Sequence, residues 1–441
     1  MKEREVKRNN YTNRKAINAW CMYDWANSAF ATTIMAVIFP VYYGTVAARD
    51  LPPTTATSYW GYTNTTAMLL VALMAPGLGA MADYSGARKR FLMYFAAGGI
   101  FFTALMVFIG VGDWKTASFL YIIALLGWSC ANIFYDSLLP SVAGMDRIDQ
   151  VSSRGYALGY LGGGLLLGIN IIMINPGIVH FAGFSFIPDA QSGSRLSFLS
   201  AAVWWAIFSI PLFRYVNELP AIIKAGESSN SLRASFQRLK HTLQDIRRYR
   251  ELFKFLIAFW FYNDGIASVI IMAALFGREI GIGQEHIMGA ILMVQFVGIP
   301  FTIVFGWLAS QLGAKRSIYL ALFIYALIAV GAYFIQSALH FWILAFLVAT
   351  VQGGSQALSR SLFGRMIPLG RTAEFFGFYD VSSKFASIIG PSLFATVGLV
   401  TGSSRNGILS LVLLFIVGGI ILSFVDEEMG FQAAGKEQLF Q

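Results

Sequence analysis

The sequence predicts an all-α integral membrane protein of twelve transmembrane helices, arranged as two six-helix bundles with both termini in the cytoplasm. Three observations lead to this fold class: the composition, the number of long apolar stretches, and a polar motif that occurs once in each half. The chain has 441 residues, of which 56% are hydrophobic and 12% are charged. The charged share is about half that of a soluble protein. A soluble core cannot bury so much apolar surface, so lipid must cover part of it.

The apolar stretches supply the membrane spans. A bilayer core requires about 20 apolar residues in helical conformation, and twelve stretches of this chain come close to that length. The expected spans are residues 17–43, 59–82, 91–112, 117–141, 155–178, 196–216, 252–276, 287–310, 317–337, 341–366, 374–400 and 406–425.

A short polar motif between apolar stretches occurs twice. Residues 79–90 read GAMADYSGARKR and residues 306–316 read GWLASQLGAKR. Duplication of this kind is typical of transporters, which are often built from repeated halves. We expect Gly79, Asp83, Gly86 and Arg88 to form a gating loop. The second copy has serine in place of Asp83, so any gating charge lies on one side only.

The basic residues set the orientation. With both termini in the cytoplasm, 25 of the 32 lysine and arginine residues lie on inner segments or at the inner ends of spans, and five lie outside. This asymmetry agrees with the positive-inside rule. The net charge of +9 is therefore explained by topology, and no basic patch interleaved with aromatic residues indicates nucleic-acid binding.

The chain divides into an N-terminal six-helix bundle, residues 1–216, and a C-terminal six-helix bundle, residues 251–441. A cytoplasmic linker, residues 217–250, joins them. Apolar residues recur in the linker at helical spacing, with arginine and lysine on the other faces, which predicts an amphipathic helix on the inner leaflet. These apolar residues are Leu232, Phe236, Leu239, Leu243 and Ile246. The linker acts either as a tether or as a regulatory segment.

Ionisable residues inside the spans carry the functional argument, because a charge in the bilayer core is costly and needs a partner or a purpose. Asp24, Asp136, Asp264 and Arg360 fall in the first, fourth, seventh and tenth spans. We expect them to line the pathway of the solute or the proton. The alternative is that some of them only hold helices together, above all Asp136, which lies near the inner end of its helix.

Two further charges share the eleventh span. Asp380 and Lys384 are four residues apart, so they lie on one helix face and can neutralise each other as a structural ion pair. The sequence gives no grouping of histidine, aspartate and glutamate at metal-ligand spacing and no glycine-rich phosphate loop. It therefore predicts no metal, no cofactor and no ATP-driven pump.

Four segments together resemble one family. They are residues 23–30 (YDWANSAF), 152–160 (SSRGYALGY), 353–362 (GGSQALSRSL) and 374–380 (EFFGFYD). They look like the autophagy-related vacuolar effluxer-like branch of the major facilitator superfamily. The resemblance implies the major facilitator fold, in which helices 1, 4, 7 and 10 line a central cavity. It also implies that Asp83 lies near the cytoplasmic start of the eleventh helix.

The resemblance and the intramembrane charges together predict a secondary active transporter and not an enzyme. The expected solute is small and polar or zwitterionic, like an amino acid, and the proton is the candidate coupling ion. Arg360 would take a carboxylate, Asp24 or Asp264 an ammonium, and Trp25 and Asn27 stand beside Asp24 on the same pathway. The chain is expected to be monomeric, surrounded by lipid, in the inner (plasma) membrane of a bacterium.

Three alternatives stay open at this stage. A lipid or drug exporter of the same fold would have a cavity dominated by apolar and aromatic residues. A membrane-embedded enzyme would need a compact polar cluster. A transporter-like sensor would differ from a carrier only in carrying little flux. The sequence does not identify the substrate or the direction of transport.

Overall fold

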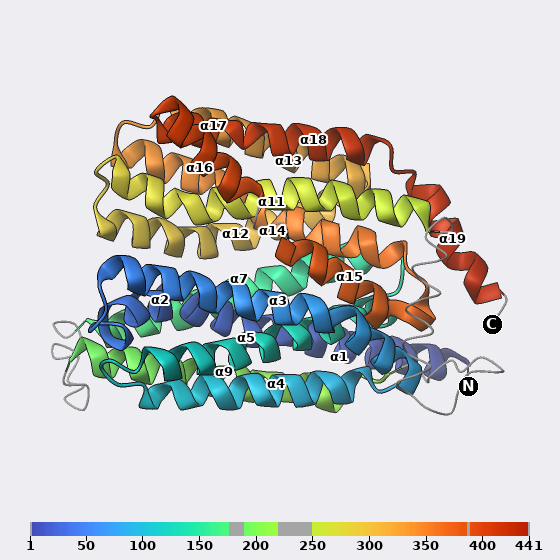
Figure 1. The fold of residues 1–441 in the computed structure, drawn as a ribbon. Helices are drawn as coiled ribbons and strands as arrows, with labels where there is room; N and C mark the ends of the chain where they lie inside the picture. Colours follow the sequence, from blue (N-terminus) through green and yellow to red (C-terminus); the bar gives the residue numbers. More distant parts are fainter. Residues whose placement is uncertain (1, 176–188, 219–248, 386–388, 440–441) are drawn as a thin grey trace. The chain divides into compact units, whose positions relative to one another are not determined.

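The computed structural model describes residues 2–175, 189–218, 249–385 and 389–439. Over these residues eleven helices are long and apolar enough to cross a membrane. Figure 1 shows the course of the helices. The expectation of an all-α membrane protein is therefore confirmed. The amphipathic helix expected in the linker falls almost entirely on residues 219–248, outside the described residues.

The chain forms two compact units that do not coincide with its two sequence halves. Unit 1 comprises residues 1–74, 87–135 and 158–218. Unit 2 comprises residues 75–86, 136–157 and 219–441. Unit 2 thus combines the second half of the chain with two short segments of the first half. The division into bundles at residues 217–250 stays a prediction.

The first half of the chain supplies eight labelled helices. They are α1 (Lys2–Ala29), α2 (Ile38–Tyr42), α3 (Pro53–Ser85), α4 (Arg88–Leu105), α5 (Trp114–Ser137), α6 (Leu139–Ala143), α7 (Ile148–Ile174) and α9 (Ala190–Tyr215). Within unit 1, α9 packs against α1 and α4. The short helix α6 and the ends of α3 and α7 belong to unit 2.

The second half supplies nine. They are α11 (Arg250–Glu279), α12 (Gln284–Leu312), α13 (Ala314–Tyr333), α14 (Ala338–Arg365), α15 (Thr372–Phe385), α16 (Ile389–Thr401), α17 (Ser404–Ser410), α18 (Val412–Ser423) and α19 (Glu427–Leu439). Within unit 2, α14 packs against α12 and α13, and α18 packs against α11.

The first span contains unusual helical turns. Between α1 and α2 the backbone forms a π-helical segment, Phe30–Val37, and a second one, Tyr43–Ala47, follows α2. Such segments are rare and frequently mark functional sites. Thr32 Oγ1 donates to the carbonyl oxygen of Ser28 at 2.9 Å, so its hydroxyl is satisfied within the span.

The repeated motif forms a short turn with a positive-φ glycine in both halves. Gly86 lies between α3 and α4 with φ of +60°, and Gly313 lies between α12 and α13 with φ of +89°. Only glycine adopts this backbone region without a steric penalty. The positive φ accounts for a glycine at this position in both copies of the motif. We call the end of the helices marked by these two turns the motif end.

The eleventh expected span differs from the prediction. One continuous helix was expected over 374–400, but the structure has α15 up to Phe385 and a separate α16 from Ile389. Residues 386–388 between them are outside the described residues. The sequence carries a signal for the second helix start, because Pro391 stands in its first turn, where proline is favoured.

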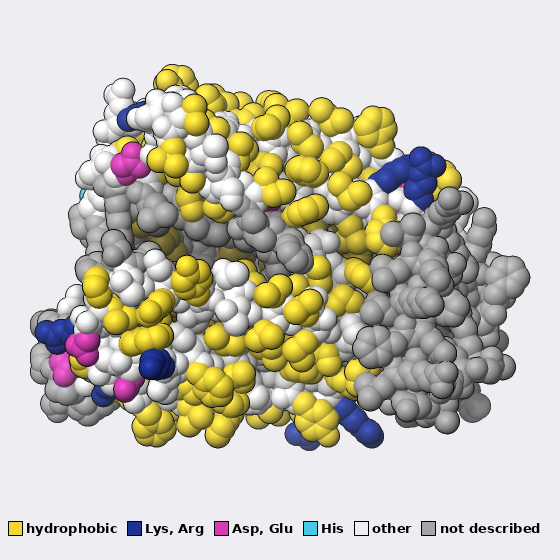
Figure 2. Space-filling model, in the orientation of Figure 1, with side chains coloured by type: hydrophobic (Ala, Val, Ile, Leu, Met, Phe, Trp, Pro, Cys, Tyr) yellow, Lys and Arg dark blue, Asp and Glu magenta, His cyan; other side chains and the backbone are white. Residues whose placement is uncertain are grey.

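The exposed surface is apolar over the middle of the helices. Figure 2 shows hydrophobic side chains covering much of the visible face, with charged side chains gathered toward the ends. Large apolar side chains are strongly exposed, including Leu399 (84%), Phe108 (79%) and Trp307 (60%). A surface of this kind is stable only in contact with lipid.

Candidate functional site

Arg360 of α14 is buried in unit 2 and holds two segments of the first half. Its Nη1 donates to Asp136 Oδ1 at 3.0 Å, and its Nε and Nη2 donate to Ser152 Oγ and the Ser152 carbonyl at 2.9 and 3.0 Å. The guanidinium also lies 4.3 Å from the ring centroid of Tyr156. The Arg360 side chain is 3% exposed, while that of Asp136 is 20% exposed. Arg360 and Asp136 therefore form a charge pair in which the aspartate is the more exposed member.

A second ion pair joins the same elements at the motif end. Arg365, the last residue of α14, pairs through Nη2 with Asp149 Oδ2 in the first turn of α7. One turn further along α7, Ser152 Oγ donates to the Ala357 carbonyl at 2.8 Å. Sequence reasoning did not select Asp149 or Arg365, because each lies near a helix end, where a charge is ordinary.

The motif aspartate lies at the start of α15. Its two carboxylate oxygens accept from the backbone N–H groups of Ala373 and Glu374 at 3.1 and 2.8 Å. Asp83 is 1% exposed. The first N–H groups of a helix have no partner within the helix, and its positive dipole end favours an anion. Asp83 is placed to anchor the start of α15.

Glycine permits this close approach. A Cβ at Gly79 would lie 2.2 Å from the Ala373 carbonyl oxygen, and one at Gly377 would lie 2.7 Å from the Ala75 carbonyl oxygen. Beside them, Arg371 Nε pairs with the fully buried Glu374 Oε2 at 3.0 Å. Gly86 forms the turn described above, and Arg88 is buried at 7% exposure.

Asp264 of α11 lies at a different place in unit 2. Its Oδ2 accepts from the backbone N–H of Gly390 at 2.8 Å, at the start of α16, and Asp264 is fully buried. A Cβ at Gly390 would lie 2.9 Å from Asp264 Oδ1 and 1.9 Å from Ser268 Oγ. The carboxylate thus caps the second part of the divided span, a contact that differs from those of Arg360.

The remaining expected pathway residues lie in unit 1. Asp24 is buried at 8% exposure. Asn27 Nδ2 donates to Asn132 Oδ1 of α5 at 2.6 Å. The ring of Trp25 stacks on Trp204 of α9 with centroids 5.5 Å apart. Trp25 thus contributes to packing between the first and sixth spans, while Asn27 and Asn132 join the first span to the fourth.

The structural ion pair expected in the eleventh span is not described, because the Lys384 side chain lies outside the described residues. Asp380 is half-buried on α15. In the described part of the chain no cluster of three or more histidine, cysteine, aspartate or glutamate residues could hold a metal ion. The site is a set of ion pairs and helix caps.

Comparison with known proteins identifies relatives over nearly the whole chain. Residues 51–435 match the family model described as vacuole effluxer Atg22 like. A Bacillus subtilis protein described as the uncharacterised MFS-type transporter YxiO is 39% identical over 416 residues, covering 94% of this chain and 95% of the relative. Autophagy-related protein 22 of Yarrowia lipolytica is 24% identical, covering 88% and 80%.

Solved structures share the fold. The proton:xylose symporter XylE of the major facilitator superfamily aligns with a TM-score of 0.70 and 14% identity, covering 98% of both chains. The human organic anion transporter MFSD10 aligns with a TM-score of 0.69 and 13% identity, covering 93% of this chain and 99% of that one. At this identity the alignments show the fold alone.

Proposed function

Because this chain belongs to the Atg22-like family of major facilitator transporters, we propose that it moves a small polar or zwitterionic solute, like an amino acid, by alternating access. We further propose the proton as coupling ion. The observation that carries both proposals is the buried pair of Arg360 and Asp136, which links the fourth span to the tenth.

The chemistry of the pair suits a carboxylate-bearing solute. A guanidinium binds a carboxylate through two parallel N–H donors, a geometry that a lysine cannot reproduce. Asp136 occupies one side of the Arg360 fork and Ser152 the other. A solute carboxylate could therefore replace Asp136 without leaving the buried guanidinium unpaired, which would be costly.

Replacement of Asp136 at Arg360 by the solute also provides a binding site for the proton. When a solute carboxylate takes Arg360, Asp136 loses its countercharge in a partly buried place, and binding of a proton neutralises it. Solute and proton then bind together. Asp136 is the more accessible of the two residues, because 20% of its side chain is exposed against 3% of Arg360. This exposure favours Asp136 as the residue that takes up the proton.

The gate is proposed at the motif end, which we assign to the cytoplasmic face from the distribution of basic residues. Asp83 holds α15, and Asp149 holds Arg365. Both contacts join the first half of the chain to the second within unit 2. Opening this end requires that they break. Asp24 remains the proposed partner of a solute ammonium, and Asp264 the proposed second acid of the pathway.

Two measurements in sequence test the proposal. Purified protein is first screened for thermal stabilisation by amino acids, short peptides, sugars, nucleosides and apolar drugs, since a ligand that binds only the folded state raises its stability. The solute found is then used for counterflow and for uptake driven by a proton gradient in liposomes. Arg90, exposed beside the motif turn, provides the control variant Arg90→Lys.

We expect stabilisation by a carboxylate-bearing solute. Arg360→Lys should lose most of the counterflow, while Arg90→Lys should retain it. Asp136→Asn should retain counterflow and lose accumulation against a gradient. Stabilisation by sugars or apolar drugs alone would overturn the solute class, and full proton-driven accumulation by Asp136→Asn would overturn the coupling role.

A further inference from the structure

The ion pair between Arg365 and Asp149 is only half satisfied. It is made by one contact, from Arg365 Nη2 to Asp149 Oδ2. Among the described residues, the buried Arg365 Nε and the buried Asp149 Oδ1 have no hydrogen-bond partner. A buried pair with an unused donor and an unused acceptor is less stable than a two-pronged one. The pair is therefore suited to breaking, and Arg365 retains a donor for another carboxylate.

Helix α19 packs on the end of α14, at the residue that follows Arg365. A Cβ at Gly430 of α19 would come 2.8 Å from the Met366 sulfur, and Met366 directly follows Arg365. Gly430 and Ala434 form the buried face of α19. The first turn of α19 therefore packs on the end of α14.

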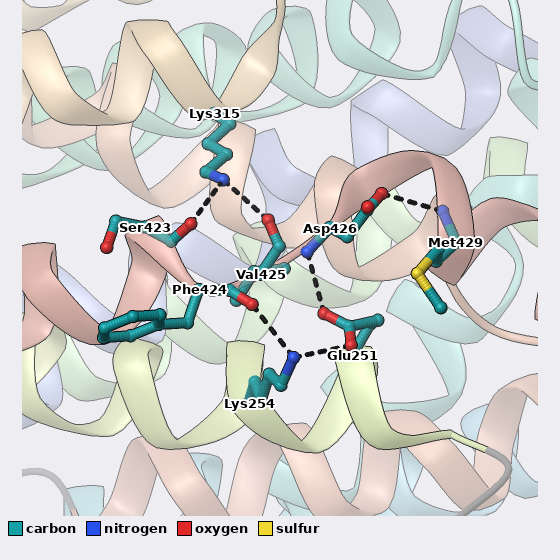
Figure 3. A network of polar contacts seen from close by, with 8 residues as sticks. All are labelled: Glu251, Lys254, Lys315, Ser423, Phe424, Val425, Asp426 and Met429. Atoms are coloured by element: carbon teal, nitrogen blue, oxygen red, sulfur yellow. Dashed lines mark hydrogen bonds and ion pairs between the residues drawn. The ribbon is translucent and has the colours of Figure 1, made fainter.

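The turn between α18 and α19 is firmly held, as Figure 3 shows. Lys315 Nζ donates to the carbonyl oxygens of Val425 and Ser423 at 2.6 and 3.3 Å. The Asp426 N–H donates to Glu251 Oε2 at 2.8 Å. These contacts fix the backbone immediately before Glu427, so the position of Glu427 relative to α14 is set by the fold.

Glu427 is half-buried in that first turn. Burial raises its pKa above the ordinary value, while the positive charges of Lys315 and Arg365 act in the opposite direction and Asp149 adds to the increase. The charges of both members of the ion pair thus act on the pKa of Glu427, in opposite directions. It comes from the same half of the chain as Arg365, whereas Asp149 comes from the other half.

We propose that Glu427 is a positioning residue that receives Arg365 when the pair with Asp149 breaks. The proposal rests on the alternating-access cycle proposed above. Opening the motif end moves Asp149 away with the first half and leaves a partly buried guanidinium on α14. A countercharge already on the second half lowers the cost of that step. Arg365 thus exchanges one carboxylate for another.

The first half of the chain has a similar segment after its last span, but its glutamate has a different partner. Val216-Asn217-Glu218 follows α9 as Val425-Asp426-Glu427 follows α18. There Lys89 Nζ donates to the Val216 carbonyl at 2.6 Å, and the Lys89 N–H donates to the Glu218 carboxylate. The acid that follows the last span of the first half is thus bonded at the motif turn, whereas Glu427 stands in the first turn of α19, which packs on the end of α14.

The test compares Glu427→Gln with Glu428→Gln. Both variants remove one negative charge from the same helix turn, but Glu428 is exposed. Spin labels at Ser85→Cys and Ser423→Cys report the distance between the two halves at the motif end. Both serines are exposed, and the native Cys21 and Cys130 are buried. Counterflow gives kcat and KM separately, and size-exclusion profiles check folding.

We expect Glu427→Gln to lower the ratio of open to closed distances about fivefold, the effect of one ion pair. It should lower kcat with little change in KM, while Glu428→Gln behaves as the parent and Glu427→Asp restores part of the loss. Equal distance distributions for the two glutamine variants would overturn the inference. If the parent itself shows no exchange of any solute, the proposed function fails, and the distance comparison still decides the role of Glu427.

Discussion

The two compact units satisfy their buried polar groups in different ways. In unit 1 neutral side chains bind one another: Asn170 Nδ2 donates to Thr33 Oγ1 at 3.0 Å, and Ser200 Oγ donates to Asn170 Oδ1 at 2.8 Å. In unit 2 a neutral buried contact of the same kind joins Tyr262 and Ser359, and charge pairs occur as well, Arg360 with Asp136 and Arg371 with Glu374. Neutral hydrogen bonds stabilise one arrangement. Charge pairs can exchange partners or protons, so we propose that the charge pairs of unit 2, and not the neutral cluster of unit 1, take part in switching.

The largest effect is expected at Arg360. Arg360→Met leaves Asp136 without its partner and should lower the free energy of unfolding by about 3–5 kcal/mol. The double variant Arg360→Met/Asp136→Leu should recover most of that stability, because no uncompensated charge remains. Thermal unfolding in detergent measures the stability, and counterflow measures transport. A double variant that transports like the parent would show that the pair is structural.

The neutral cluster of unit 1 should behave differently. Asn170→Leu leaves the hydroxyl groups of Thr33 and Ser200 without their amide partner and should cost about 1–3 kcal/mol. Adding Thr33→Val should recover part of the stability, as at Arg360. Here, however, the double variant should also transport. If only the double variant at Arg360 and Asp136 loses transport, then charged buried contacts, and not buried polar contacts in general, are required for transport.

How far the sequence predicts these features depends on the distance between partners along the chain. Composition, apolar length and the repeated motif are local, and they predicted the fold. The charged residues were also found, because a charge within an apolar stretch stands out. Their pairing was not found: Arg360 and Asp136 are 224 residues apart, and no periodicity relates them.

Other features left a weaker signal. Asp149 and Arg365 lie near helix ends, where ordinary solvation or helix-dipole contacts account for a charge. Only the fold shows that they meet and are partly buried. The division of the eleventh span did leave a trace in Gly390-Pro391, but the apolar run through 374–400 outweighed it. Trp25 was predicted on the solute pathway from its neighbour Asp24, whereas its stacking on Trp204 depends on how α1 and α9 pack.

Asp83 provides a second test of the charged contacts in unit 2, because its carboxylate accepts hydrogen bonds from the start of α15. Asp83→Asn should leave the protein folded and weaken the hold on α15 by about 0.5–2 kcal/mol. The motif end should then open more often. The distance between labels at Ser85→Cys and Ser423→Cys reports that population. An unchanged distribution would mean that close packing of Gly79 on Ala373, and not the carboxylate, keeps the end closed.

The smallest effect is expected where the two halves resemble each other most. Lys89 Nζ donates to the Val216 carbonyl at 2.6 Å, after α9, and Lys315 Nζ donates to the Val425 carbonyl at 2.6 Å, after α18. Each lysine thus satisfies a carbonyl beyond a helix end, where a positive charge is favourable by about 0.3–1 kcal/mol. Lys89→Met and Lys315→Met should each lower stability by that amount.

The neighbouring arginines provide matched controls, because Arg90 and Arg316 are exposed. Arg90→Met and Arg316→Met should leave thermal unfolding nearly unchanged. The lysine variants should then differ in their effect on transport. Lys89→Met loosens only the end of α9, whereas Lys315→Met also frees the turn that positions Glu427, so it alone should lower kcat in counterflow. Equal loss of transport in both lysine variants would indicate that the motif turns act only as helix caps, with no special role for the second half.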